Sequence, residues 1–155
     1  MTDHLSQERR SENMRRIRSK DTRPEMLVRR TAHGLGYRFK LHDESLPGKP
    51  DLVFPKRKAV IFVHGCFWHA HDCKKGRRVP KSNLEYWNKK RDRNKIRDDC
   101  ASADLKNWGW RVMQIWECET KDVTLMIDRI RNFLNFGEAK DVNAYEPNFE
   151  VSSIP

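Results

Sequence analysis

Residues 59–73 read AVIFVHGCFWHAHDC, an apolar run that passes directly into histidine, cysteine and aromatic side chains. A buried strand that ends in metal ligands and titratable bases is typical of an active site. Packing gives no reason for three histidines and two cysteines in so short a segment. We therefore expect metal binding, catalysis or both at the end of this strand.

The composition predicts a single basic domain. The chain has 155 residues, enough for one hydrophobic core, and its 32 lysines and arginines against 22 acidic residues give a formal net charge of +10. The basic residues cluster in residues 9–30, 74–81 and 89–97. Such clusters favour a phosphate-bearing partner over a merely soluble surface, so nucleic acid is the leading ligand class.

The sequence also indicates the compartment. The N-terminus is polar, and no apolar run approaches the roughly 20 residues of a membrane span. We expect a soluble, intracellular protein with no membrane partner. In a reducing compartment its four cysteines are thiols or metal ligands, and Cys100, isolated on a predicted helix, is expected to be buried.

Helical and strand patterns alternate along the chain and predict an α/β fold. Helices are expected from Asp21 or Thr22 to residues 34–36, from Ser82 or Asn83 to about residue 107, and over residues 122–136. Strands are expected over residues 37–41, 52–54, 58–63 and 111–116. The second and third strands are close enough to pair as a hairpin.

The ends of the chain differ from its middle. Residues 1–20 hold too few apolar anchors for a packed face and are predicted to be a basic arm that orders on a partner. Residues 21–137 are predicted to form the folded domain, and residues 138–155 a weakly ordered tail.

The long predicted helix carries an apolar stripe with a polar interruption. The stripe comprises Leu84, Trp87, Ala101, Leu105 and Trp108. On the same face Arg91, Asn94 and Asp98 stand where apolar residues belong. Because buried polar groups must be paired or bound to something, this interruption points to a site.

Four side chains of the types that tetrahedral zinc prefers lie in two segments. Cys66, His71 and Cys73 share one loop, and Cys118 follows the strand over residues 111–116. The set predicts a closed, structural zinc site that pins the loop to the edge of the sheet. The spacing is not the two-CxxC pattern, and unrelated reactive thiols are the alternative.

A second metal site is expected at Asp51, which opens one strand while Val63 and His64 close its neighbour. A carboxylate and a strand-end carbonyl are hard oxygen ligands that suit magnesium, whose coordination substrate phosphate commonly completes. For a lone aspartate at a strand start, the alternative is a turn residue.

The histidines supply candidates for proton transfer. Because an ordinary imidazole titrates near neutral pH, His64 and His69 are predicted to serve as acid and base. Asp98 on the long helix is placed to orient one of them, and Glu25, in the first turn of the first predicted helix, to hold a water of the magnesium ion.

Phe67, Trp68 and Trp87 stand among lysines and arginines. Core packing is the default for aromatic side chains. Adjacent residues on a polar loop cannot both bury easily, however, so we interpret these three as wedges that enter a base stack while the cations hold phosphates.

These motifs resemble those of the very-short-patch repair (Vsr) endonucleases, bacterial enzymes that nick DNA beside the thymine of a thymine–guanine mismatch. The matching segments are Arg10-Ser11-x-Asn13-Met14, Asp21-Thr22 with Glu25, Leu46-Pro47-Gly48-x-Pro50-Asp51, residues 62–73, Arg97-Asp98 and residues 105–118.

The resemblance implies a restriction-endonuclease-like core of the PD-(D/E)XK superfamily, a mixed sheet flanked by helices with a structural zinc site. It assigns zinc to Cys66, His71, Cys73 and Cys118, and magnesium to Asp51 and the backbone carbonyl of Val63. It implies acid–base or phosphate roles for His64 and His69, supported by Asp98 and Glu25, and intercalation beside the mismatch by Phe67, Trp68 and Trp87.

The expected function is that of a magnesium-dependent endonuclease that nicks double-stranded DNA 5′ of the thymine in a T:G mismatch. We expect a cytoplasmic, nucleoid-associated bacterial monomer, with mismatch-repair proteins as candidate partners. Two alternatives stay open: a sequence-specific or defence endonuclease that cuts paired DNA, and a zinc-pinned DNA-binding module without catalysis.

Overall fold

The computed structural model describes residues 6–17 and 20–136. The predicted tail, residues 138–155, lies outside the described residues, as do parts of the predicted arm. The elements are, in order, α1 (Gln7–Arg16), α2 (Arg23–Gly34), β1 (Lys40–Leu41), β2 (Leu52–Phe54), η1 (Pro55–Arg57), β3 (Ala59–His64), α3 (Leu84–Asn107), β4 (Arg111–Trp116), η2 (Glu117–Lys121) and α4 (Val123–Asn135).

The four strands form one mixed sheet in the order β1-β2-β3-β4. The predicted hairpin is confirmed, because β2 pairs antiparallel with β3 and Leu52 lies opposite Ile61. Strand β4 is parallel to β3, and the long helix α3 makes the crossover between them. The first strand is shorter than predicted, with only Lys40–Leu41 paired to β2. The fold is therefore a mixed α/β architecture, as the sequence predicts.

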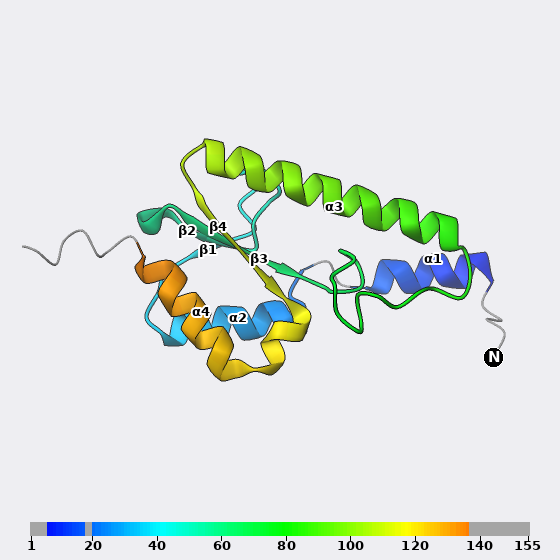
Figure 1. Ribbon diagram of the computed structural model, residues 1–155, viewed down its shortest axis with the longest axis horizontal. Coiled ribbons are helices and arrows are strands. Elements are labelled where there is room, and N and C mark those ends of the chain that lie inside the picture. Colours follow the sequence, from blue (N-terminus) through cyan, green and yellow to red (C-terminus); the bar gives the residue numbers. More distant parts are fainter. Residues whose placement is uncertain (1–5, 18–19, 137–155) are drawn as a thin grey trace, which may run out of the picture.

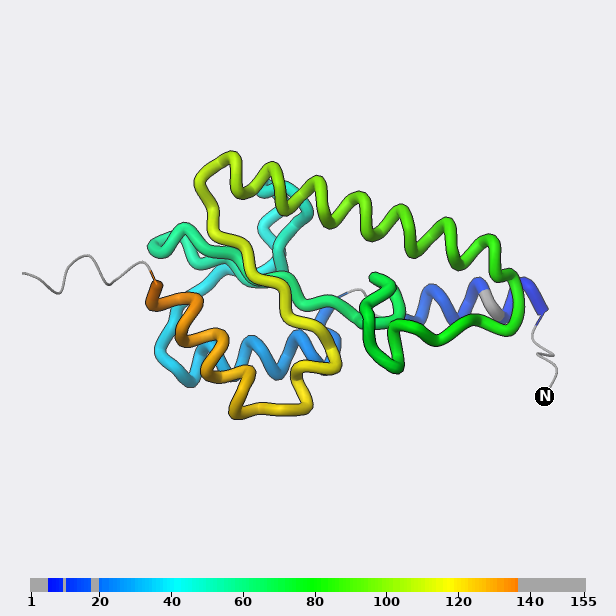
Figure 2. The backbone as a smooth tube through the Cα atoms, in the orientation of Figure 1, coloured from blue at the N-terminus to red at the C-terminus, as the bar shows by residue number. Residues whose placement is uncertain are grey.

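Helices cover both faces of this sheet (Figures 1 and 2). One face packs against α2 and α4, where Val28, Ala32, Met126, Ile130 and Leu134 are buried against the strands. The other face packs against α3 through Leu105. Residues of β3 alternate between the two sides, with Ile61 in the first cluster and Phe62 in the second, as the two-residue period of a strand requires.

The burial predicted for α3 is partly wrong. Ala101 and Leu105 are buried, but Leu84 and Trp108 are 47% and 57% exposed and Cys100 is exposed as well. For Leu84, Figure 1 shows the reason: α3 runs well beyond the sheet toward α1, so its N-terminal half has no strand beneath it. Trp108 caps the C-terminal end of α3 and Cys100 lies in its C-terminal half, so this overhang does not account for their exposure. Helical periodicity identifies a face of the helix but not where the surface that covers this face ends.

Helix α1 forms within the segment predicted to be an arm. The side chain of Ser6 caps it by accepting a hydrogen bond of 3.3 Å from the amide of Arg9. Glu12 and Arg16 add an exposed ion pair of 2.8 Å one turn apart. The ordering of this segment on DNA stays a prediction.

Among the residues that the structure describes, no helix has both the length and the apolar character needed to cross a membrane.

Candidate active site and metal cluster

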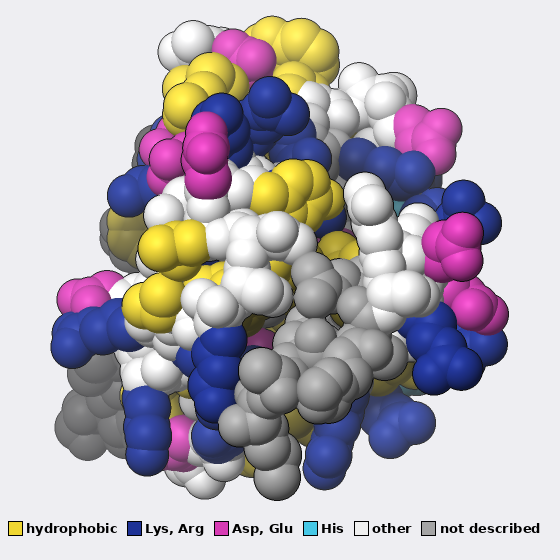
Figure 3. Space-filling view, turned by 90° about the vertical axis from the view of Figure 1, so that its right-hand side faces the viewer, with side chains coloured by type: hydrophobic (Ala, Val, Ile, Leu, Met, Phe, Trp, Pro, Cys, Tyr) yellow, Lys and Arg dark blue, Asp and Glu magenta, His cyan; other side chains and the backbone are white. Residues whose placement is uncertain are grey.

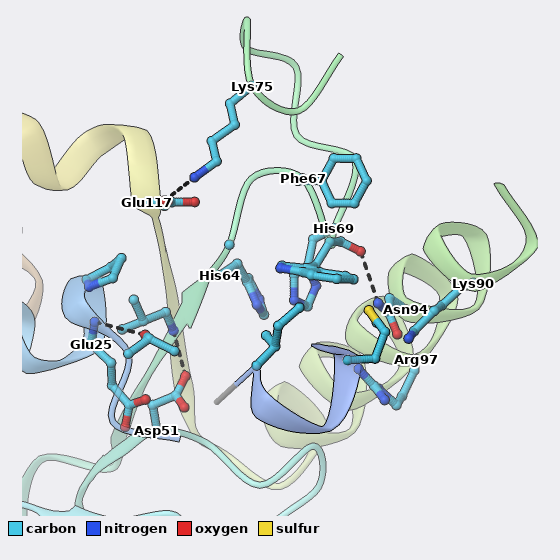
Figure 4. Close-up of a pocket in the computed structure, with 17 residues that line it drawn as sticks. Glu25, Asp51, His64, Phe67, His69, Lys75, Lys90, Asn94, Arg97 and Glu117 are labelled. Carbon is cyan, nitrogen blue, oxygen red and sulfur yellow. Dashed lines mark hydrogen bonds and ion pairs between the residues drawn. The ribbon is translucent and has the colours of Figure 1, made fainter. Parts of the chain in front are cut away.

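A cavity of about 490 Å³ opens where β3 ends. Its walls include Glu25 from α2, Asp51 from the start of β2, His64 from β3 and His69 from the following loop. Glu25 and Asp51 lie on one side of the cavity, and the two histidines on the other (Figure 4). The structure thus brings these four predicted site residues into one cavity.

Asp51 is held by the strand next to it. Oδ2 of Asp51 accepts a hydrogen bond of 2.7 Å from the amide of Val63, a consequence of the antiparallel register between β2 and β3. Burial raises the pKa of the Asp51 carboxyl to about 7, although the Val63 hydrogen bond and the nearby Arg29 charge oppose this rise. A buried carboxylate that is costly to ionise fits a divalent cation, whose charge would replace the proton.

His64 is buried, with 6% of its surface exposed. Burial, with the nearby charge of His69 second, lowers the pKa of its imidazole to about 4, so the ring is neutral at pH 7. Its Nε2 atom is buried and has no hydrogen-bond partner among the described residues. A buried imidazole nitrogen at a cavity wall is therefore available to a ligand.

His69 faces His64, with ring centroids 4.2 Å apart. Its Nδ1 atom shares a hydrogen bond with Oδ2 of Asp98 from α3. The carboxylate orients the ring and leaves Nε2 as the nitrogen available for proton transfer. The predicted pairing of Asp98 with one of the histidines is thus present.

Helix α3 anchors the loop after β3 through the polar residues that interrupt its stripe. Nδ2 of Asn94 donates a hydrogen bond of 3.0 Å to the carbonyl of Trp68, and the guanidinium of Arg91 donates to the carbonyl of Gly76. Gly76 has no room for a side chain, because a Cβ there would lie 1.8 Å from the carbonyl oxygen of His71. The polar face of α3 thus contacts the loop that carries His69 and the predicted zinc ligands.

The four predicted zinc ligands come together, three from the loop after β3 and Cys118 from η2. The ligand atoms of Cys66, His71, Cys73 and Cys118 all lie within 4.8 Å of one another. Sγ of Cys118 is 3.5 Å from Nδ1 of His71, and the Cys118 amide donates to Sγ of Cys66 at 3.3 Å. Three thiols and an imidazole at such distances match the donor set of a tetrahedral zinc site.

The thiols of this cluster have different environments. Burial raises the pKa of Cys66 to about 12, whereas a hydrogen bond from the Gly76 amide lowers the pKa of Cys73 to about 6. The His71 ring stacks on Trp116 with 4.2 Å between centroids. The cluster therefore joins the loop to the end of β4, where Trp116 and Cys118 lie.

The three predicted wedge residues form one aromatic cluster beside the cavity. Phe67 lies 5.2 Å from Trp68 and 5.9 Å from Trp87, and the two tryptophans are 5.7 Å apart. All three are half-buried. The ammonium of Lys90 lies 5.5 Å from the Trp68 ring and 5.6 Å from the Trp87 ring. Partly exposed rings beside a cation suit contact with stacked bases.

Two residues beside the site are not among those predicted. Arg29 binds Glu25 and His42 from the next turn of α2, and His42 lies 2.9 Å from Glu25 and 3.7 Å from Asp51. The four-residue spacing of Glu25 and Arg29 is a signal that the sequence does contain. No local pattern marks His42, because its contacts are made across the fold.

Comparison with known proteins identifies the class of protein. A carboxylate and two histidines in one cavity of a basic α/β protein suit the hydrolysis of nucleic acid. The family described as "DNA mismatch endonuclease Vsr" matches residues 2–75. The type II nicking enzyme V.XorIIP of Xanthomonas oryzae pv. oryzae is 52% identical over 135 residues, 87% of this chain and 98% of that protein.

Two further relatives extend the comparison. The type II nicking enzyme V.NmeAIP of Neisseria meningitidis is 40% identical over 91% of this chain and 99% of its own. The DNA mismatch endonuclease Vsr of Escherichia coli K12 is 42% identical over 76% of this chain and 75% of its own. The chain belongs to the Vsr family and is a DNA endonuclease.

Proposed function

We propose that this endonuclease nicks one strand of double-stranded DNA 5′ of the thymine in a T:G mismatch, with magnesium as its catalytic cofactor. The observation that carries the proposal is the shared cavity of Asp51, His64 and His69. The names of the E. coli relative and of the nicking relatives support mismatch recognition and single-strand cleavage respectively.

Asp51 and the backbone carbonyl of Val63 would hold the magnesium ion. When bound there, magnesium polarises the scissile phosphate and stabilises the charge that develops on it. Asp51 is suited to this role because its neighbours give it few competing hydrogen bonds: the Val63 amide donates to one of its oxygens and His42 stands 3.7 Å from the other. Glu25, 2% exposed and on the same side of the cavity, would orient water at the site.

The two histidines have different proposed roles, His69 in proton transfer and His64 in binding the phosphate. His69 takes a proton from the attacking water, because its hydrogen bond to Asp98 holds the ring in place and leaves Nε2 as the nitrogen that can accept the proton. His64 stays neutral at pH 7, since burial lowers its pKa, and its buried Nε2 has no hydrogen-bond partner in the part of the chain that the structure describes. His64 therefore serves best as a hydrogen-bonding group beside the scissile phosphate.

The surroundings of the cavity suit DNA. Lysine and arginine side chains, with some acidic ones, surround hydrophobic side chains on the face at the N-terminal end of α3 (Figure 3). Phe67, Trp68 and Trp87 would enter the base stack next to the mismatch, where unstacking costs least. Zinc at Cys66, His71, Cys73 and Cys118 would hold the loop that carries two of these rings.

Two alternatives have different standing. A zinc-pinned module without catalysis does not fit a family whose named members are endonucleases. An endonuclease that cuts paired DNA would use the same cavity. It would differ only in which DNA substrate Phe67, Trp68 and Trp87 select. We propose a monomer, because a mismatch is an asymmetric substrate, and mismatch-repair proteins as candidate partners.

The experiment compares end-labelled duplexes that are identical except for one pair, T:G, T:A or C:G, incubated with the enzyme and magnesium. The proposal predicts a single nick 5′ of the mismatched thymine in the T:G duplex and an intact complementary strand. Equal cutting of the paired duplexes would support the paired-DNA alternative instead, and cutting of both strands would contradict nicking.

A further inference from the structure

A permanent positive charge lies next to the proposed magnesium site. Ligand atoms of Asp21, Glu25 and His42 lie within 4.8 Å of one another, close enough to surround one cation. The Arg29 guanidinium already binds all three: it is 2.7 Å from Asp21, 2.8 Å from Nε2 of His42, and paired with Glu25. The cluster is thus filled by a cation that belongs to the protein.

This cluster borders the catalytic carboxylate directly. His42 lies between the two sites, with Nε2 2.9 Å from Glu25 and Nδ1 3.7 Å from Asp51. Glu25 is almost fully buried, and the Arg29 side chain is 12% exposed. At this depth the carboxylate needs a counter-charge, because an unpaired buried charge is strongly destabilising.

The chemistry of the cluster would otherwise suit a divalent ion. Two carboxylates and an imidazole are ligands for Mn²⁺ and related metals. A guanidinium keeps its proton at any physiological pH and cannot share this position with a second cation. Arg29 therefore excludes metal from the cluster as long as it stays in place.

We propose that Arg29 is a built-in cation that occupies the position of a second divalent ion and so restricts metal binding to the Asp51 side of the cavity. The inference rests on the proposed function in that it takes Asp51 as the ligand of the catalytic metal. It makes Arg29 a positioning residue: the guanidinium fixes the Glu25 carboxylate and sets how many ions the cavity holds.

The test counts Mn²⁺ ions bound by the zinc-loaded protein, from the loss of the free Mn²⁺ signal in electron paramagnetic resonance. Arg29→Met removes the charge and keeps a side chain of similar length, and it is expected to bind one Mn²⁺ more than the wild type. Adding Glu25→Gln should abolish this gain, and Arg29→Lys should not show it. Arg30→Met is the matched control, since Arg30 is the next residue of α2 and is exposed.

Equal ion counts in wild type and Arg29→Met would overturn the inference, as would an equal gain in Arg30→Met. If Arg29→Met unfolds, Mn²⁺ should restore folding to it and to Arg29→Gln, because the ion replaces the lost charge. Variants that stay unfolded in millimolar Mn²⁺ would also contradict the inference.

The Asp51→Asn variant separates this inference from the proposed function. As a single substitution, Asp51→Asn should remove the Mn²⁺ bound at the proposed catalytic site. Combined with Arg29→Met, it should leave the additional ion in place. Mn²⁺ binding to the wild type that does not depend on Asp51 would refute the proposed catalytic site. The difference in the number of bound ions between Arg29→Met and wild type would still test the role of Arg29.

Discussion

The amide of Val63, one residue before the end of β3, donates a hydrogen bond of 2.7 Å to the Asp51 carboxylate at the start of β2. Antiparallel pairing of the two strands fixes this contact, because Leu52 lies opposite Ile61 and Asp51 therefore falls beside the last residues of β3. The sheet itself thus places the carboxylate in the cavity that His64 also lines.

Divalent metal binding should depend steeply on pH below neutrality. Burial raises the pKa of Asp51 to about 7, and proton and metal compete for the same carboxylate. The apparent affinity for Mn²⁺ should therefore fall roughly tenfold for each pH unit below 7 and level off above it. Calorimetric titration from about pH 5.5 to about pH 8.5, on both sides of this pKa, checks this. An affinity independent of pH would contradict it.

Acid should destabilise the fold through His64. Its folded pKa of about 4 lies below the ordinary value of 6.5, so only the unfolded chain binds the proton between these values. The free energy of unfolding should fall as the pH drops from 6.5 toward 4, by up to about 1.4 kcal/mol per pH unit. Urea denaturation of the wild type against His64→Gln isolates this contribution.

The matched control for this measurement is His33→Gln, because His33 is exposed on α2. This variant should keep the pH dependence of the wild type. A His64→Gln protein with the wild-type slope would show that the buried imidazole is not responsible.

Zinc removal should loosen the active site as well as lower stability. Cys118→Ser takes one of four ligands from a cluster that joins the loop to β4. We expect about one zinc ion per wild-type chain. The Cys118→Ser variant should lose this ion, melt at a lower temperature and nick DNA more weakly than the wild type. Elemental analysis and thermal unfolding measure these effects. Cys100→Ser, a change at an exposed cysteine, should keep the metal, and a zinc-free wild type would refute the site.

The aromatic wedge should carry the preference for mismatched DNA. Trp68→Ala should weaken binding to a T:G duplex by about 1–3 kcal/mol, the contribution of one stacked base, and reduce the preference over T:A. Fluorescence anisotropy with both duplexes measures each affinity. Trp108→Ala, which changes an exposed ring at the other end of α3, should bind like the wild type. Equal losses on both duplexes would contradict a role in selection.

Local signals made much of this fold predictable. Continuous apolar runs identified β2 and β3, and the largely apolar segment 111–116 identified β4. Side-chain caps marked the starts of two helices: Thr22 accepts from the Glu25 amide and Asp122 from the Leu125 amide. The polar interruption of α3 also predicted the contact between that helix and the site. These features depend on neighbouring residues and therefore leave a pattern in the sequence.

The features that escaped prediction depend on tertiary contacts. The exposure of Leu84 follows from where the sheet ends beneath α3, which helical spacing does not encode. Helix α1 is polar almost throughout, so it lacks a hydrophobic pattern. The contact of Arg29 with His42 joins α2 to the turn after β1, thirteen residues further along the chain.

The central claim is that the Asp51 carboxylate holds the metal that drives cleavage. The most direct test is the single-turnover rate of nicking of a T:G duplex by Asp51→Asn, which keeps an oxygen to accept from the Val63 amide and loses the charge. The control is Asp43→Asn, since Asp43 binds Ser45 in the same connection. We predict a rate at least about 100-fold lower for Asp51→Asn, at wild-type stability or above, and an unchanged rate for Asp43→Asn. A fully active Asp51→Asn enzyme would contradict the account.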